Sequence, residues 1–260
     1  MATSSNAGRA QKARPVSQWR SPRNLWENLK SIVGALAIFL VLRAFLVEAY
    51  RIPSGSMIPT LLVGDWLFVN KAIYGAHIPL SRASLPAVRE PRRGDVVVFV
   101  SPYQADEAER GADPTPTLVK RLVGTPGDTL YMRKGVLYVN GIAQRRGFGM
   151  GEPDSAMGTS VSPLFDWQKK VGLSASRFGA APAQPSLDNW GPIVVPPQRL
   201  FMMGDSRYNS KDSRYWGFVP RENVRGKPLF VYYSYNADDS DRPLPPLTDI
   251  RWSRIGHWIK

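Results

Sequence analysis

Serine and lysine are the two residue types in this chain whose positions could together cleave an amide bond. Ser56 lies in the run Ile-Pro-Ser-Gly-Ser-Met-Ile-Pro at residues 52–59, where a glycine and two prolines predict a rigid turn. Lys120 lies in the apolar run Leu-Val-Lys-Arg-Leu-Val at residues 118–123. An apolar site disfavours the ammonium form and lowers a lysine pKa from about 10.4 towards neutral pH. The two residues therefore predict a serine nucleophile with a lysine general base.

The chain holds few alternatives to this pair. It has two histidines, His77 and His257, and no cysteine, so acyl transfer must use serine or threonine without the common Ser-His-Asp triad. The absence of cysteine also excludes a disulfide framework and a Cys-ligated metal site. The simpler interpretations are a solvated turn serine at position 56 and a strand-edge lysine at position 120. Arg121 is the better candidate for a solvated side chain on that strand.

The chain is strongly basic, with a formal net charge of +13 and an isoelectric point near 10.1. Such a charge is typical of nucleic-acid-binding proteins, but here the basic residues are spread along the whole chain. Only the first thirty residues form a distinct basic segment, with six basic residues and one acidic residue. A basic segment beside an apolar one indicates membrane topology, with the basic side in the cytoplasm. We therefore expect a cytoplasmic tail at residues 1–30 and no nucleic-acid partner.

An apolar segment runs from Ile32 to Val47, with Arg43 as its only charged residue. Its sixteen residues would span about 24 Å as a helix, which is less than the roughly 30 Å hydrocarbon core of a bilayer. The helix is expected to begin earlier, because Ser-Pro at residues 21–22 is a helix start signal. The sequence therefore predicts a transmembrane anchor at residues 31–50.

Flanking residues bear on whether this anchor is retained. Trp26 and Tyr50 lie on either side of the segment, where interfacial aromatics are expected. One alternative is a buried helix of a globular domain, which would leave the basic flank without a purpose. Another is a cleavable signal peptide, since Val-Glu-Ala at residues 47–49 resembles a small-x-small cleavage site. Cleavage there would leave Ser56 seven residues from a new N-terminus, so we expect a retained anchor whose removal, residues 1–49, leaves a folded domain.

Beyond residue 50 the sequence predicts a mainly β structure. Seven short runs rich in Val, Leu, Phe and Tyr are bounded by turn residues, which is typical of strands. These runs are residues 66–71, 95–101, 118–123, 129–133, 136–140, 199–203 and 228–235. Lys-Gly at residues 134–135 and Asn-Gly at residues 140–141 predict hairpin turns.

Residues 51–260 are therefore expected to form a catalytic domain built on antiparallel β-sheet. Two segments in it lack strand signals. Residues 74–93 form a basic loop that contains proline, and residues from about 142 to 197 form a stretch rich in Gly, Pro and Ser. We interpret the second stretch as an inserted subdomain at one edge of the sheet.

These motifs together resemble the type I signal peptidases, which are membrane-anchored Ser-Lys endopeptidases that remove signal peptides from exported proteins. The resemblance covers residues 48–65, 93–99, 118–128, 204–217 and 254–256, in the family's order. It implies a serine protease without metal or cofactor. It also implies a single-pass protein of the inner (cytoplasmic) membrane, with its catalytic domain on the periplasmic or extracytoplasmic side. The implied partners are the signal peptides of exported preproteins and the lipid bilayer, and the secretion translocon is a further candidate.

The resemblance also assigns roles to residues, with the serine and lysine above as nucleophile and general base. Ser54 matches the side-chain donor of the oxyanion hole, which acts with the Ser56 backbone N–H. Such a donor stabilises the transition state by about 3–4 kcal/mol. Ser210 matches the serine that hydrogen-bonds the lysine ammonium, and Asp212 and Arg214 match a nearby ion pair that supports the turn.

Apolar residues near the dyad match the walls of the family's substrate pockets. They are Ile52, Pro53, Met57, Leu118 and Val119, whereas Leu61 is expected in the ordinary core. An extended peptide would add to strand edges beside the nucleophile, so that backbone hydrogen bonds supply affinity. The crowded walls should admit only alanine, glycine or serine at the first and third residues before the cut, which is a small-x-small motif.

Other interpretations stay open. A relative with the same Ser-Lys fold could mature a dedicated substrate such as a conjugation pilin, whereas a self-cleaving repressor would need DNA-binding helices that this sequence lacks. From a different class, the chain could be a catalytically silent, membrane-tethered β module that binds peptides. The joint presence of Ser56, Lys120 and Ser210 favours the active enzyme.

Overall fold

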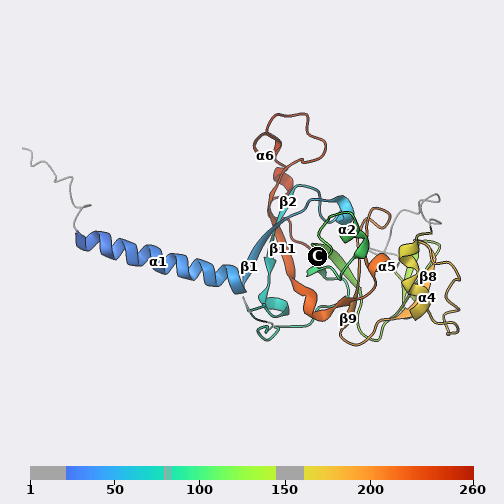
Figure 1. Cartoon of the computed structure of the whole chain (residues 1–260). Helices are drawn as coiled ribbons and strands as arrows, with labels where there is room; N and C mark the ends of the chain where they lie inside the picture. The colour runs from blue at the N-terminus through green and yellow to red at the C-terminus, as the bar shows by residue number, and fades with distance from the viewer. Residues whose placement is uncertain (1–21, 79–80, 82, 145–160) are drawn as a thin grey trace, which may run out of the picture. The chain divides into compact units, whose positions relative to one another are not determined.

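A computed structural model describes residues 22–78, 81, 83–144 and 161–260 of the chain (Figure 1). The chain divides into two compact units, Met1–Leu42 and Arg43–Lys260. Most of the expected basic tail, and part of the expected insertion, lie outside the described residues. Within the described ranges, no helix combines the length and the apolar character that a membrane span requires.

Helix α1 (Pro22–Phe45) contains the apolar segment. It begins at Pro22, where the sequence signal places the helix start. Apolar side chains at five consecutive positions, residues 38–42, are exposed, and consecutive helical positions point in different directions around the axis. The helix is therefore apolar around its whole circumference in this stretch, unlike an amphipathic surface helix.

A seven-stranded antiparallel sheet is the larger of the two sheets described in the second unit (Figure 1). Its strands are β1 (Val47–Arg51), β2 (Asp65–Asn70), β3 (Val96–Val100), β4 (Thr117–Gly124), β9 (Arg199–Met203), β10 (Val219–Pro220) and β11 (Val224–Ser234), in the order β1-β2-β11-β3-β4-β9-β10. The expected mainly β, antiparallel fold is thus confirmed. Two apolar clusters pack against this sheet, one around Leu61 and Leu67 and one around Phe99 and Met202.

The structure differs from the sequence interpretation at the end of the apolar segment. Residues 47–50, expected to be membrane anchor, belong to strand β1, which pairs along its whole length with β2. Tyr50, expected to lie at a membrane interface, instead packs against the apolar cluster that contains Leu67. The physical reason is strand pairing: every residue of β1 lies opposite a residue of β2, so the sheet satisfies its backbone N–H and C=O groups.

A second, four-stranded antiparallel sheet packs around its own apolar cluster. Its strands are β5 (Thr129–Arg133), β6 (Val136–Val139), β7 (Ile142–Ala143) and β8 (Trp190–Val194), in the order β7-β6-β5-β8. The two expected hairpin turns join β5 to β6 and β6 to β7, and both residues of each turn have positive φ, as type I′ turns require. Strand β8 lies inside the stretch that shows few strand signals, and it supplies the buried Trp190 to the cluster.

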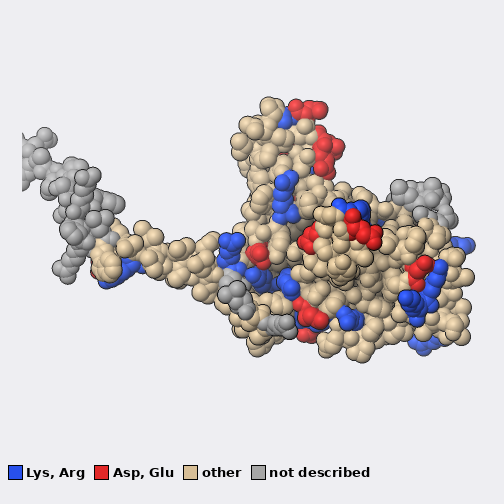
Figure 2. Space-filling view, in the orientation of Figure 1, with Lys and Arg blue, Asp and Glu red and all other residues tan. Residues whose placement is uncertain are grey.

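The helical elements after α1 are all short in the described part of the second unit. The α-helices are α2 (Ala105–Glu109), α4 (Trp167–Val171), α5 (Ser213–Trp216) and α6 (Pro245–Thr248). The 3-10 helices are η1 (Gly55–Met57), η2 (Ala72–Tyr74), η4 (Pro163–Phe165), η5 (Arg221–Asn223) and η6 (Trp252–Arg254). Figure 2 shows blue and red side chains interspersed over the visible face, so the basic residues on that face do not gather in one patch.

Candidate active site

Ser56 lies in the 3-10 turn η1, which connects β1 to β2. Ser54 precedes the turn in an extended conformation, and the turn is closed by a hydrogen bond from the Ile58 amide to the Gly55 carbonyl at 3.1 Å. Met57 is 1 % exposed and packs in the cluster with Leu67. The buried methionine therefore fixes the turn to the core, while Ser56 stays partly accessible.

Lys120 reaches Ser56 from strand β4. Its Nζ lies 2.6 Å from Ser56 Oγ, although the two residues are 64 positions apart. The Lys120 side chain is buried, with 4 % of the residue exposed. Burial lowers the pKa of its amine to about 8, while the negative charges of Asp212 and Asp205 act in the opposite direction. The structure therefore brings the sequence-predicted nucleophile and base into direct contact.

Arg121, which the sequence suggested as a solvated side chain, is buried instead, so that interpretation is wrong. Only 3 % of the residue is exposed. Its Nε and Nη2 donate to the two carboxylate oxygens of Asp205 at 2.8 and 2.6 Å, and its Nη1 donates to the backbone carbonyls of Gly94 and Lys260 at 2.7 and 2.9 Å. A bidentate carboxylate and two further acceptors satisfy the guanidinium inside the fold, so it needs no water.

The loop after β9 is hydrogen-bonded to the turn that contains Ser56. The Ser206 amide donates to the Ser56 carbonyl at 3.1 Å, which joins this loop to the catalytic turn. A Cβ at Gly204 would clash with both the Ser210 side chain and the Ser56 carbonyl, so a glycine is required for this close approach. Ser210 is 7 % exposed and its Oγ donates to Asp212 at 2.9 Å.

Asp212 and Arg214 form the expected ion pair, and both side chains are almost fully buried. The Nε and Nη2 of Arg214 each donate to one carboxylate oxygen of Asp212 at 2.8 Å. Asp212 also accepts from the Gly204 amide at 3.0 Å and caps the start of α5. Burial raises the pKa of the Asp212 carboxyl, but the charge and hydrogen bonds of Arg214 outweigh it and hold the pKa below its usual value. Asp212 therefore remains anionic beside Ser210.

Two cavities meet at the dyad, and both are lined by Ser54, Ser56, Leu118 and Lys120. The smaller, of about 70 Å³, contains all five predicted substrate-contacting residues in its wall. They are Ile52, Pro53, Met57, Leu118 and Val119, and Tyr50, Arg51 and Thr117 complete the lining. The larger, of about 500 Å³, extends past Ser210 to α2 and to Tyr215 and Trp216 of α5. Leu61 lies outside both linings and is fully buried in the core.

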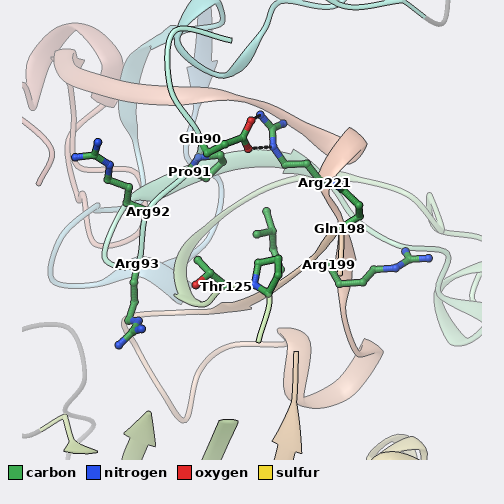
Figure 3. Close-up of a pocket in the computed structure, with 10 residues that line it drawn as sticks. Glu90, Pro91, Arg92, Arg93, Thr125, Gln198, Arg199 and Arg221 are labelled. Atoms are coloured by element: carbon green, nitrogen blue, oxygen red, sulfur yellow. Dashed lines mark hydrogen bonds and ion pairs between the residues drawn. The ribbon is translucent and has the colours of Figure 1, made fainter. Parts of the chain in front are cut away.

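A further cavity of about 800 Å³ lies elsewhere, and none of the predicted site residues lines it (Figure 3). Arg221 is engaged there in an ion pair with Glu90 at 2.5 Å. The guanidinium groups of Arg92, Arg93 and Arg199 extend outward from this cavity in different directions. Its volume exceeds that of the cavities at the dyad, but it brings no nucleophile and base together.

Sequence reasoning missed several residues that hold the site. No role was predicted for Gly204 or Asp205, although Asp205 pairs with Arg121 and accepts from Thr60 Oγ1 at 2.6 Å. Lys211, which lines the larger cavity, forms ion pairs with Asp106 and Glu107. An arginine in an apolar strand was the available signal for a buried acidic partner, since buried guanidinium groups are seldom unpaired.

Comparisons with known proteins identify the family of the chain. The model of the family described as signal peptidase, peptidase S26, matches residues 25–233. The chain is 36% identical over 241 residues to a signal peptidase I of Pseudomonas aeruginosa, in an alignment that covers 87% of this chain and 77% of the relative. It is 37% identical over 246 residues to a signal peptidase I of Pseudomonas fluorescens, with the same coverage of the two chains.

Among solved structures, a signal peptidase I from Enterococcus faecalis V583 matches with 25% sequence identity and a TM-score of 0.31. That match covers 54% of this chain and 97% of the other. The family match and the two curated relatives extend over most of the sequence, including the turn with Ser56 and the strand with Lys120. The chain therefore belongs to the signal peptidase family of serine peptidases, peptidase S26.

Proposed function

We propose that Ser56 is the nucleophile of this signal peptidase and that the neutral amine of Lys120 is its general base. The observation that carries the proposal is the 2.6 Å separation of Lys120 Nζ and Ser56 Oγ, with the lysine buried. A pKa lowered to about 8 leaves a usable fraction of neutral amine near pH 7 to 8. A general base must lie within hydrogen-bond reach of the proton that it abstracts, and this pair meets that condition.

The reaction then follows from the positions of these atoms. Lys120 Nζ takes the proton of Ser56 Oγ as Oγ attacks the scissile carbonyl carbon, and the negative charge moves to the carbonyl oxygen. The Ser54 hydroxyl and the Ser56 backbone N–H would stabilise this oxyanion. The Lys120 ammonium gives its proton to the leaving nitrogen, which releases the mature chain and leaves an acyl-Ser56 ester. Water, deprotonated by the same amine, hydrolyses the ester and restores the serine.

Ser210 and the Asp212–Arg214 pair position the base in this proposal. The Ser210 hydroxyl donates a hydrogen bond to Asp212, so the lone pairs of its oxygen remain available to accept a hydrogen bond from the Lys120 ammonium. Asp212 is held by two hydrogen bonds from the Arg214 side chain, one from the Arg214 amide and one from the Gly204 amide. It cannot rotate away without leaving the buried Arg214 charge unpaired. Asp212 and Arg214 act through Ser210 and do not touch the substrate.

The 70 Å³ cavity supports specificity for a small-x-small motif. Its wall includes apolar side chains, and two of them, Ile52 and Met57, are buried, which favours a small side chain there. A bulky residue at the first or third position before the cut should therefore abolish cleavage by overpacking. Unchanged processing of a preprotein with leucine at either position would exclude this cavity as the specificity pocket.

We further propose that the apolar part of α1 holds the enzyme at the inner membrane, with the N-terminus in the cytoplasm and the β domain outside. The exposed apolar side chains of α1 and the basic residues before them support this orientation. The lipid bilayer and the preproteins are then its partners, and the secretion translocon is a candidate.

Two truncations test the role of the anchor, one that ends before strand β1 and one that removes part of it. Removal of residues 1–42 should leave a folded domain that cuts soluble peptides but processes membrane-bound preproteins less efficiently, because tethering raises the local substrate concentration. Removal of residues 1–49 should weaken the fold, because it deletes three of the five residues of β1. Equal activity of the shorter truncation and the full chain on membrane-bound preproteins would contradict the anchor's role.

The direct test of the function is to incubate the purified full chain with a preprotein and to sequence the new N-terminus of the product. We expect the wild type to cleave after a small-x-small motif and Ser56→Ala not to cleave. Ser174→Ala, a control at an exposed serine, should cleave normally. Cleavage by Ser56→Ala would exclude Ser56 as the nucleophile. Processing of one dedicated substrate and no general preprotein would favour the pilin-type alternative.

A further inference from the structure

The larger active-site cavity has a charged wall that the proposed mechanism does not use. Lys211 and Glu107 both line this cavity, together with Ser56 and Lys120. Lys211 Nζ lies 2.5 Å from Asp106 Oδ2 and 2.5 Å from Glu107 Oε1. Arg110 pairs with the same two carboxylates at 2.8 and 2.9 Å. The wall therefore holds two cations and two anions that balance each other.

This wall is placed by charge and not by an apolar core. Helix α2 contains no buried residue. Its N-terminal neighbour Gln104 is buried and donates to Ser101 Oγ at 2.8 Å. At the other end of the contact, Lys211 directly follows Ser210 in the loop beside the dyad. The side chains of Lys211 and Glu107, which line the cavity, remain 29% and 22% exposed, so a peptide in the cavity can reach them, and Asp106 acts on them from behind.

The two cavities suggest the path of the substrate past Ser56. The smaller cavity accepts the small side chain before the cut, and Ser56 lies where the two cavities meet. The chain that follows the scissile bond must leave on the other side of the nucleophile, which is the side of the larger cavity. That cavity has room for several side chains, at about 500 Å³.

We propose that the ion-pair network of Lys211, Arg110, Asp106 and Glu107 forms a charge-balanced wall for the first residues after the scissile bond. With all charges present the wall is balanced, so it discriminates little between acidic and basic residues there. Loss of the Lys211 charge leaves an excess negative charge that attracts a basic residue and repels an acidic one. Loss of the Glu107 charge does the opposite. Because the groups are partly buried, these effects exceed those of a fully exposed charge.

This inference rests on Ser56 as the proposed nucleophile, and one experiment can separate the two. Three peptides would carry Glu, Gln or Lys at the first or second position after the cut and would be otherwise identical. The kcat/KM of each is measured with the full-length wild type, Lys211→Met, Glu107→Gln and Ser56→Ala. Lys169→Met is the matched control, because Lys169 forms a similar ion pair with Asp166 at 2.6 Å but does not line the cavity.

Lys211→Met should raise the ratio of kcat/KM for the Lys peptide over the Glu peptide by three- to tenfold, and Glu107→Gln should lower it by a similar factor. Both shifts should shrink at high ionic strength, because salt screens partly exposed charges. Lys169→Met should leave the ratio unchanged. These opposite shifts cannot come from a general loss of structure, which would slow all three peptides equally.

An unchanged ratio in both variants would overturn the inference, and so would an equal loss of activity on all peptides. If Ser56→Ala still cleaved the peptides, the proposed nucleophile itself would be wrong, which is a separate outcome from a failed charge ratio.

Discussion

Lys120 and Arg121 are neighbours on β4, but their side chains lie on opposite faces of the strand, where their charges have different partners. Both residues are at least 96 % buried from solvent, with 4 % and 3 % exposed. On one face, Arg121 meets both oxygens of Asp205 and two backbone carbonyls. On the other face, Lys120 contacts the Ser56 hydroxyl, and the acidic groups Asp205 and Asp212 influence it only through their fields.

The difference shows that burial alone does not make a cation reactive. A buried guanidinium with a bidentate carboxylate is stabilised in its charged form and serves the structure. A buried amine beside a neutral hydroxyl has its charged form destabilised, so its pKa falls to about 8 and it can exchange protons. The acidic partner decides between a structural and a chemical role, and variants of the two faces should separate these roles.

The largest effect should follow from removing the proton-accepting amine. Lys120→Ala and Lys120→Arg should both reduce kcat/KM by about 10²- to 10⁴-fold, the usual contribution of a general base. Arginine keeps the charge but cannot give up its proton. Ser56→Ala should lose at least as much, and the Ser56→Ala, Lys120→Ala double variant should lose no more than the serine variant, because both changes disable one step. Substantial turnover by a folded Lys120→Arg would place another base in the site.

On the face of β4 that carries Arg121, substitutions should change the stability of the fold. Arg121→Met leaves the carboxylate of Asp205 buried without its partner, so the free energy of unfolding should fall by about 3–5 kcal/mol. The double variant Arg121→Met, Asp205→Leu should recover part of this loss, because no uncompensated charge remains. Urea unfolding followed by circular dichroism measures both. If the free energy of unfolding of Arg121→Met lay within about 1 kcal/mol of the wild-type value, the Arg121–Asp205 pair would not be essential to the fold.

The catalytic face should be stabilised by the same kind of substitution. The lowered pKa means that the folded protein disfavours the ammonium form, at a cost of up to about 3 kcal/mol below pH 8. Lys120→Met removes this cost. As pH rises from about 8 to 10.5, the unfolded chain binds more protons than the folded one, so the wild type gains stability and the advantage of the variant disappears. An equally stable wild type and variant at pH 7 would argue against a destabilised charge.

The smallest effect is expected from the residue that aims the base. Ser210→Ala should lower kcat by roughly tenfold with little change in KM, because the lysine and nucleophile remain in contact while one hydrogen bond of about 1–2 kcal/mol is lost. Ser174→Ala provides a control with the same chemical change on the surface. A loss as large as that of Lys120→Ala would give Ser210 a direct part in the chemistry.

The contrast also explains what sequence reasoning could achieve. The dyad was predictable because each partner carries a local signal, a proline-flanked Ser-Gly-Ser turn and a lysine in an apolar strand. Arg121 had the same local surroundings as Lys120, which can indicate a buried cation, but no local pattern reveals which carboxylate pairs with it, because Asp205 is 84 positions away. The role of Lys211 depends in the same way on contacts more than a hundred residues distant.

The strands were likewise predictable where they carry a local signal. Most strands with Val- and Phe-rich runs between turn signals were predicted within a few residues, including β5 and β9, whose bounds match. Strand β1 was missed because the apolar run continues into it at Val47 and because its pairing with β2 has no local signal. Strand β8 was missed because Gly191 and Pro192 lie inside it and both residues are rare in strand interiors. Pairing with β5 overrides these local preferences.

The most direct test of the account is the pH dependence of kcat/KM for a peptide substrate that does not itself titrate between pH 6 and 10. If Lys120 must be neutral in the free enzyme, kcat/KM should rise with pH, reach half its maximum near pH 8 and level off above it. Replacing His77 and His257 together should not move this midpoint. A flat profile across the range, or a midpoint near 6.5 that disappears with the histidines, would contradict a buried neutral lysine as the base.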